Sequence, residues 1–231
     1  NGTRGVISYE EKTPLKDLTL DNLFIDIGAK DAEEARKLVQ IGDFAVYEAP
    51  RFEQNGVLCG PYLDNRIGCV TLLLMMEQLA DKEIENDLYF VFTAQEEVGL
   101  RGAGAAAFAV EPDAAIAVDV TDTGDLPEMK SAMAVELGKG PAVKVMDRSV
   151  ICTPAVVDAL EQAAKDCGVS AQREILLCGG TDTSALQKAR AGVQAGAVSI
   201  PTRYIHSPSE LCAVSDVEDA AKLLAQYALR K

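Results

Sequence analysis

A chain of 231 residues, 48% hydrophobic and 25% charged, has the composition of an ordinary globular protein with one sizeable core. Its formal net charge of −14 argues against nucleic acid and anionic membranes as partners, because phosphate binding needs clustered Lys and Arg. No stretch approaches the ~20 unbroken apolar residues that span a bilayer. The sequence also begins without a Met and without the apolar region of a signal peptide, so we expect a fragment or a trimmed product.

The cysteines indicate a reducing compartment. They are scattered without CxxC spacing, and most lie in apolar contexts. Free buried thiols in the cytoplasm are the expected state of such residues, and neither a disulfide framework nor a zinc knuckle is expected. The six residues are Cys59, Cys69, Cys152, Cys167, Cys178 and Cys212.

Residues 1–60 predict a small β-rich module, barrel-like in form. Short β-prone runs at residues 5–9, 23–28 and 44–47 alternate with turns. One helical pattern follows Asp31, which we predict to be an N-cap with Glu34 at the capping-box position. The module on its own carries no obvious chemistry.

Residues 61–231 change to alternating helix and strand patterns, which predict a layered α/β domain. Thr153 followed by Pro154 predicts the start of one helix, and a capping box at Ser215 and Glu218 predicts the start of the last. Val217, Ala220, Ala221, Leu224 and Ala228 are expected on the inner face of that last helix. The predicted helices cover about 67–79, 100–108, 154–167, 183–189 and 215–228, and the predicted strands 89–94, 114–119, 174–177 and 193–200.

The domain is expected to be organised around the predicted strand at 89–94 and the two carboxylates that follow it. Open α/β sheets place their chemistry at the carboxyl ends of their strands. Adjacent residues on a strand point to opposite sides, so Glu96 and Glu97 should have different roles. One can bind a metal while its neighbour handles a proton.

Four segments present a potential metal ligand at or just beyond an apolar strand or run. They carry Asp64, the Glu96–Glu97 pair, Asp119 and His206, the only histidine in the sequence. Carboxylates and imidazole together suit Zn²⁺, Co²⁺ or Mn²⁺, and carboxylate-rich sites commonly hold two ions.

Six motifs in this order resemble the M42 family of dinuclear metalloaminopeptidases, which includes glutamyl and TET-type enzymes and some proteins labelled endoglucanase M. The resemblance covers residues 61–231 almost completely. The motifs are Leu63-Asp64-Asn65-Arg66-Ile67-Gly68, Ala94-Gln95-Glu96-Glu97-Val98-Gly99-Leu100-Arg101-Gly102-Ala103, Asp119-Val120-Thr121, Gly138-Lys139-Gly140-Pro141, Gly179-Gly180-Thr181-Asp182 and Ile200-Pro201-Thr202-Arg203-Tyr204-Ile205-His206-Ser207-Pro208.

The resemblance implies a phosphorylase/hydrolase-like catalytic domain that removes N-terminal residues from peptides. It implies that Asp64 bridges two divalent ions, with Zn²⁺ and Co²⁺ ahead of Mn²⁺. Glu97 and His206 would complete the shell of one ion, and Asp119 would bind the other. Glu96 would be the general base. The leading module would be part of the family's dimerisation domain, and the assembly a dodecamer built from dimers.

The family also carries a metal-ligating His ahead of the β-rich module, and this sequence has no such segment. We therefore expect weak or incomplete metal loading and impaired activity. A non-enzymatic family member that binds peptides or serves in assembly is the first alternative. A glycoside hydrolase is a weaker one, because adjacent glutamates fit poorly around a sugar bond and the chain has no Trp.

Two further motifs carry weaker hints. Residues 179–182 lack the Lys of a phosphate-binding P-loop, so a turn that lines the active-site wall is expected there. Arg203 hints at contact with a substrate carboxylate.

Overall fold

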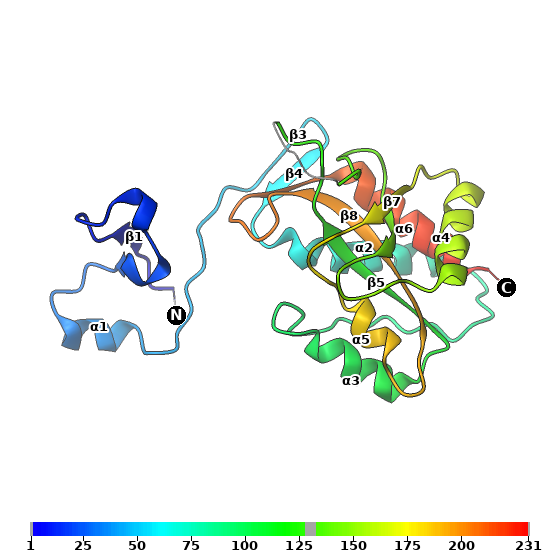
Figure 1. Ribbon diagram of the computed structural model, residues 1–231, viewed down its shortest axis with the longest axis horizontal. Helices are drawn as coiled ribbons and strands as arrows, with labels where there is room; N and C mark the ends of the chain where they lie inside the picture. Colours follow the sequence, from blue (N-terminus) through cyan, green and yellow to red (C-terminus); the bar gives the residue numbers. More distant parts are fainter. Residues whose placement is uncertain (1, 128–132, 231) are drawn as a thin grey trace. The chain divides into compact units, whose positions relative to one another are not determined.

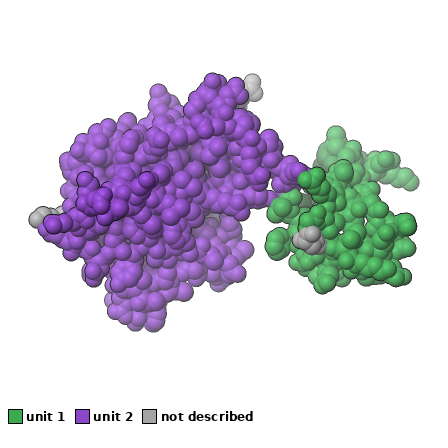
Figure 2. All heavy atoms as spheres, turned by 180° about the vertical axis from the view of Figure 1, so that it is seen from behind, with its two compact units in different colours: residues 1–46 green, residues 47–231 purple. Residues whose placement is uncertain are grey.

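The computed structural model describes residues 2–127 and 133–230, and the chain divides into two compact units, residues 1–46 and 47–231 (Figures 1 and 2). The predicted site residues all belong to the second unit. Each unit is described on its own below.

Unit 1 is a two-stranded antiparallel sheet with short helices. Strand β1 (Val6–Tyr9) pairs with β2 (Leu23–Asp26), and 3-10 turns at 15–17 and 20–22 lie between them. Helix α1 (Ala32–Leu38) begins as predicted, because the Asp31 side chain accepts a hydrogen bond from the Glu34 backbone N–H at 2.9 Å. The Glu34 carboxylate accepts from the Lys30 N–H at 2.8 Å, one residue before the N-cap.

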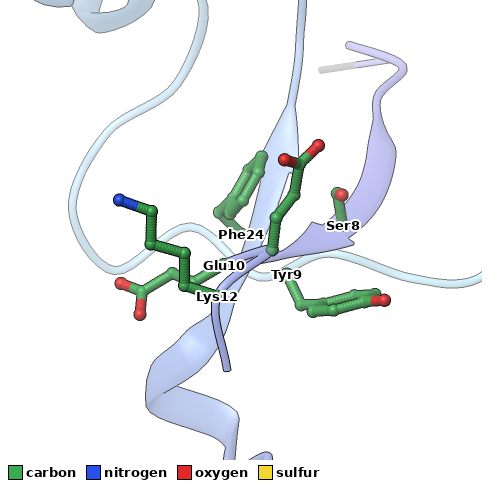
Figure 3. A pocket seen from close by; sticks show the side chains of 6 residues that line it. Ser8, Tyr9, Glu10, Lys12 and Phe24 are labelled. Atoms are coloured by element: carbon green, nitrogen blue, oxygen red, sulfur yellow. The ribbon is translucent and has the colours of Figure 1, made fainter. Parts of the chain in front are cut away.

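The barrel-like form expected for the first module does not occur in the described part of unit 1. The run at 44–47 forms no strand, and β1 and β2 are the only strands among residues 2–46. Two strands cannot close around a core, and none of these residues is buried. A shallow hollow between β1 and β2 is lined by Ser8, Tyr9, Glu10, Glu11, Lys12 and Phe24 (Figure 3).

Unit 2 contains a seven-stranded mixed sheet of order β3-β4-β9-β8-β6-β7, with β5 paired to β8. Strand β8 organises it: it runs parallel to β5 and antiparallel to both β6 and β9. The strands are β3 (Phe52–Gln54), β4 (Val57–Gly60), β5 (Ala114–Thr121), β6 (Ala142–Met146), β7 (Gln172–Ile175), β8 (Gln194–Arg203) and β9 (Glu210–Ala213).

Helices cover both faces of the sheet, as the predicted layered α/β fold requires (Figure 1). Along β5, Ile116 packs into the main core with α2, α4 and α6, whereas its neighbour Ala115 packs against a second cluster, which contains Ala107 of α3 and is also contacted by Leu186 of α5. This alternation places the two helix groups on opposite faces. The helices are α2 (Leu63–Leu79), α3 (Arg101–Val110), α4 (Pro154–Asp166), α5 (Thr183–Gln187) and α6 (Val214–Ala228).

The predicted helices all form, with one error at the start of α6. Its five predicted inner residues are all buried. Its N-cap, however, is Ala213 and makes no side-chain capping bond, so the capping box expected at Ser215 is wrong. Strand β9 ends at Ala213 and pairing to β4 and β8 fixes that point, so tertiary structure sets the helix start. None of the described helices is long and apolar enough to cross a bilayer.

The strand predicted at 89–94 is the main correction to the fold. No strand is assigned between residues 80 and 100. Phe90 packs against the core, but Tyr89 and Phe92 are 63% and 51% exposed. The segment has the apolar β-prone composition of a strand, but a strand also needs a neighbour for its backbone hydrogen bonds. No described strand pairs with it.

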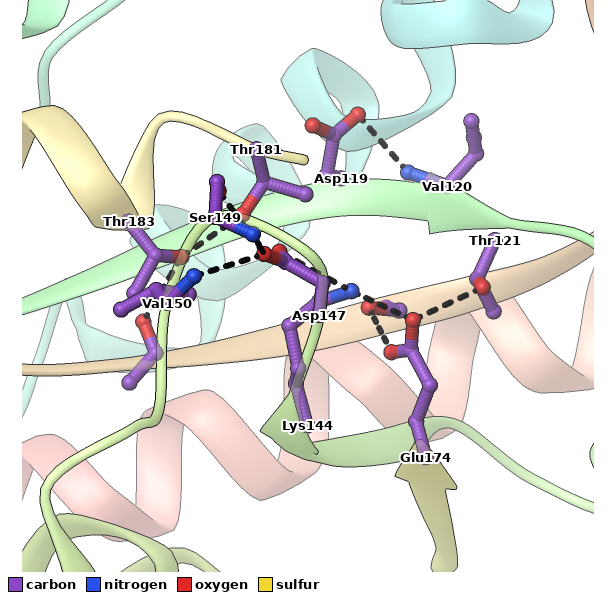
Figure 4. A network of polar contacts seen from close by, with 12 residues as sticks. Asp119, Val120, Thr121, Lys144, Asp147, Ser149, Val150, Glu174, Thr181 and Thr183 are labelled. Carbon is purple, nitrogen blue, oxygen red and sulfur yellow. Dashed lines mark hydrogen bonds and ion pairs between the residues drawn. The ribbon is translucent and has the colours of Figure 1, made fainter. Parts of the chain in front are cut away.

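A buried polar network joins four strands of the sheet (Figure 4). Lys144 of β6 is fully buried, and its Nζ lies 2.5 Å from Oε1 of Glu174 on β7 and 3.6 Å from Asp147. Glu174 also accepts hydrogen bonds from Thr121 of β5 at 2.9 Å and Ser199 of β8 at 2.5 Å. The Glu174 carboxylate thereby connects β7 to β5, β6 and β8, and it neutralises the charge of buried Lys144.

Candidate metal centre

Asp64, Glu97 and His206 meet at one place. One donor atom from each lies within 4.8 Å of the other two, and this is the one such group of three that residues 2–127 and 133–230 contain. His206 Nε2 lies 3.2 Å from Asp64 Oδ2 and 3.3 Å from Glu97 Oε1. Asp64 is largely buried, whereas the side chains of Glu97 and His206 are about 60% and 65% exposed.

Three different elements present these side chains. Asp64 lies at the start of α2, in a kinked first turn where its own ψ of 112° is not helical, two residues after Tyr62, whose φ of 62° is left-handed. Glu97 lies in the turn that precedes α3. His206 lies in the loop from β8 to β9 and also has a left-handed φ, 59°. Such values are costly for residues with a Cβ, and strained residues of this kind cluster at active sites and ligand clamps.

The spacing of these donors fits a divalent cation. In a tetrahedral site with bonds of about 2.0–2.1 Å, neighbouring ligand atoms lie roughly 3.3 Å apart. The two distances from His206 Nε2, 3.2 and 3.3 Å, match this value. Two carboxylates and an imidazole are also the donor types that Zn²⁺ and Co²⁺ accept.

The carboxylates around this cluster repel one another when no cation is bound. Burial is the largest cause that raises the pKa of Asp64 to about 6, followed by Glu97, while His206 acts in the opposite direction. Burial, followed by Glu97 and Asp182, likewise raises the pKa of Glu96 to about 7. A bound cation would relieve this repulsion by favouring the ionised forms.

Asp119 lies outside the group of three donors. It is 8% exposed near the end of β5, and its Oδ1 accepts a hydrogen bond from the Val120 N–H at 2.9 Å. Burial raises its pKa well above the ordinary value; the Val120 N–H opposes this, and the charges of Asp64 and Glu96 add to it.

Glu96 and Glu97 differ in environment, although the predicted reason for the difference is wrong. They do not follow a strand but enter a turn in which the N–H groups of Gly99 and Leu100 donate to the Glu96 carbonyl. Glu96 is half-buried, while Glu97 is exposed and contacts His206.

Close packing of α2 on β5 brings the Asp64 and Asp119 segments together. A Cβ at Gly68 would lie 2.2 Å from Asn65 Oδ1 and 2.9 Å from the Val118 carbonyl oxygen. Asn65 uses its side chain to join the two elements, donating from Nδ2 to the Val118 carbonyl at 2.8 Å and accepting from the Gly68 N–H at 3.1 Å. Only glycine leaves room for this arrangement.

Sequence reasoning missed two carboxylates near the cluster. Glu210 is buried and accepts backbone hydrogen bonds from both Asp64 and His206. Asp182 accepts from the Thr93 hydroxyl at 2.7 Å, and its charge acts on both Glu96 and Asp119. Each could have been noticed in the sequence. Glu210 begins the apolar run Glu210-Leu-Cys-Ala, and Asp182 ends the motif Gly-Gly-Thr-Asp182, in which it had been given no role.

Arg203 is occupied by an internal partner. Its Nη2 and Nε donate to the carboxylate of Asp125 at 2.6 and 3.3 Å, and Asp125 also accepts from the Leu137 N–H. A guanidinium held this way is a poor receptor for a substrate carboxylate, so the structure does not support that hint.

We expect Asp125→Asn to lower the free energy of unfolding at pH 7 by about 1–2 kcal/mol, because it removes a partly exposed charge-assisted pair. Burial is the largest single influence on the pKa of Asp125 and raises it, but the hydrogen bonds from Arg203, Thr123 and the Leu137 N–H together outweigh burial and hold the pKa below the ordinary 3.8. The stabilisation is therefore present above that value and is lost as pH falls through the lowered folded-state pKa. Urea unfolding at several pH values should give a wild-type advantage that shrinks below about pH 4; a constant advantage would contradict this account.

The fold and the cluster of two carboxylates and an imidazole place this chain among the α/β proteins that have a candidate divalent-metal site. The sequence profile of the M42 glutamyl aminopeptidase family matches residues 3–223. The chain belongs to this family, which confirms the resemblance and the fold class.

Individual relatives agree with this assignment. A protein of Acetivibrio thermocellus, provisionally named as an aminopeptidase, is 48% identical over 227 residues that cover 98% of this chain and 68% of that protein. The structure of an aminopeptidase from the archaeon Desulfurococcus kamchatkensis superimposes with a TM-score of 0.92 at 35% identity, covering 98% of this chain and 65% of that one. The TET1 peptidase of Pyrococcus horikoshii, which can assemble into a tetrahedron or a large octahedral shell, gives 0.83 at 34% identity, covering 96% and 64%. The chain thus spans about two thirds of the length of these relatives.

Proposed function

We propose that this chain carries the metal-binding and proton-transfer residues of an aminopeptidase that removes N-terminal amino acids from peptides. The observation that carries the proposal is the convergence of Asp64, Glu97 and His206, with donor atoms within 4.8 Å, in a chain of the M42 family.

Asp64, Glu97 and His206 would hold one divalent ion, with Zn²⁺ or Co²⁺ the best match to the donor types. Asp64 would bridge to a second ion bound by Asp119, whose electrostatic coupling to Asp64 supports this assignment. Bound ions would polarise the peptide carbonyl and acidify a water molecule.

Glu96 is assigned the role of general base. It is the half-buried neighbour of a proposed ligand, and it lies close enough to Asp64, Glu97 and His206 for each to perturb its ionisation. A carboxylate in that position takes a proton from the attacking water and returns it to the leaving amine. A free α-amine on the substrate, held by an acidic group, would restrict attack to the first peptide bond.

Assembly and location are further parts of the proposal. The assemblies named for Pyrococcus horikoshii TET1 support a homo-oligomer. All six cysteines are free thiols in the structure, which supports a reducing compartment such as the cytoplasm.

The test is hydrolysis of a panel of unblocked aminoacyl-arylamides after chelation, and again after Zn²⁺ or Co²⁺ is added. We expect chelation to abolish turnover, metal to restore it, and an N-acetylated substrate to stay intact in every condition. His206→Ala is the matched variant and should need far more metal for the same rate. If no arylamide were hydrolysed in any condition while peptide binding was retained, the result would instead support the alternative of a peptide-binding or assembly member of the family.

A further inference from the structure

We propose that Glu210 is the positioning residue of the metal centre, an inference that rests on the proposed metal site. Its carboxylate bridges the backbones of two of the three proposed ligands: Oε2 accepts from the Asp64 N–H at 3.0 Å, and Oε1 accepts from the His206 N–H at 3.1 Å. Glu210 is 2% exposed. A single buried side chain thereby holds together segments 142 residues apart in sequence, 64 and 206.

The strand pairing explains how Glu210 reaches both segments. It is the first residue of β9 and pairs with Gly60, the last residue of β4. The chain turns from β4 into α2 through Tyr62, which brings the Asp64 N–H to Glu210 Oε2. The loop from β8 folds back over the same point and delivers His206 four residues before Glu210. Glu210 therefore lies at the end of the loop that carries His206 and is paired with the residue from which the Asp64 segment leaves β4.

Both segments need an external anchor, because their own backbones are not relaxed. Tyr62, Tyr204 and His206 have left-handed φ values of 62°, 60° and 59°. Residues with a Cβ adopt this region at a free-energy cost, so the segments would relax to other conformations without compensating contacts. A charge-assisted hydrogen bond to each N–H supplies such a contact.

The arrangement uses both oxygens of the carboxylate, which defines the informative variant. Glu210→Gln keeps size and shape, but one oxygen becomes an NH₂ donor that faces a backbone N–H. One of the two hydrogen bonds must then be lost. Outer partners of metal ligands typically influence metal affinity by 10–100-fold.

Asp216 supplies a matched control in the same unit. It is also buried, and its two oxygens accept backbone hydrogen bonds from Gly138 at 2.7 Å and Gly140 at 2.8 Å. It contacts none of the proposed ligands in the hydrogen bonds described. Asp216→Asn therefore removes the same kind of interaction and measures the general consequence of disturbing a buried bridging carboxylate.

The experiment compares wild type, Glu210→Gln and Asp216→Asn by two measurements. The first is the amide spectrum of the metal-free protein by nuclear magnetic resonance, with the Asp64 and His206 signals assigned. The second is Zn²⁺ affinity by calorimetry. We expect Glu210→Gln to shift at least one of the two amide signals and to weaken Zn²⁺ binding by about 10–100-fold. Asp216→Asn should leave both amide signals in place and keep the Zn²⁺ affinity within about twofold of that of wild type.

The inference would be overturned if Glu210→Gln kept the wild-type amide chemical shifts and Zn²⁺ affinity. It would also be overturned if Asp216→Asn weakened Zn²⁺ binding as much as Glu210→Gln does. A wild-type protein that binds no Zn²⁺ would refute the proposed metal site. The amide signals of the metal-free protein would still decide the role of Glu210 in that case.

Discussion

Replacing Glu96 with Gln is expected to lower the rate of arylamide hydrolysis by roughly 10²–10⁴-fold, the range for loss of a general base. The substitution removes the proton acceptor but keeps the volume of the side chain. Because Glu96 is not one of the three clustered donors, Zn²⁺ affinity should stay close to that of wild type. The measurement pairs kcat at saturating metal with calorimetric titration of the ion.

Glu97→Gln is the matched comparison, one residue along the chain. Its carboxylate lies 3.3 Å from His206 Nε2, so its loss should weaken metal binding first. Excess metal should then restore part of the activity of Glu97→Gln and none of that of Glu96→Gln. If excess metal rescued Glu96→Gln, the roles assigned to the two residues would have to be exchanged.

Lys144→Met is expected to cost about 3–5 kcal/mol in the free energy of unfolding, because it leaves buried Glu174 without its charge partner. The Lys144 and Glu174 side chains are fully buried, so water cannot replace the lost contact. Urea denaturation followed by far-ultraviolet circular dichroism measures the change, since the chain has no Trp.

Two comparisons make this prediction specific. Combining Lys144→Met with Glu174→Gln should recover part of the loss, because the amide can still bond Thr121 and Ser199 without a buried charge. Arg173 is the sequence neighbour of Glu174 and forms an ion pair with Glu161, but its side chain is 67% exposed. Arg173→Met breaks this exposed ion pair and should cost much less free energy of unfolding. Equal losses for Lys144→Met and Arg173→Met would show that burial is not the deciding factor.

The elements were predictable where the information is local. Thr153 and Pro154 mark the start of α4, and the spacing of apolar residues in α6 identifies its buried face, because both signals reside within a few turns of one helix. The segment at 89–94 was not predictable in this way. Its composition is that of a strand, but whether it becomes one depends on a neighbour that the sequence of the segment cannot specify.

The same distinction applies to the candidate site. Asp64, Glu97 and His206 were found because carboxylates and a histidine beside apolar segments have a recognisable chemistry and together match a family pattern. Glu210 was not found, because its role lies in two hydrogen bonds to backbone groups, and these depend on the pairing of β4 with β9. Asp119 was assigned as a ligand from the family resemblance, and that assignment stays a prediction.

The tight contact at Gly68 limits which sequence variants this protein can tolerate. Even the single methyl group of alanine would meet the Asn65 side chain and the Val118 carbonyl, and would force α2 away from β5. Asp64 moves with α2 and Asp119 with β5, so such a variant would widen the space between two carboxylates while leaving both in place. A survey of variants that scores only the acidic residues and His206 would classify Gly68→Ala as harmless. The geometry of the metal centre therefore depends on Gly68, a residue that has no functional group of its own.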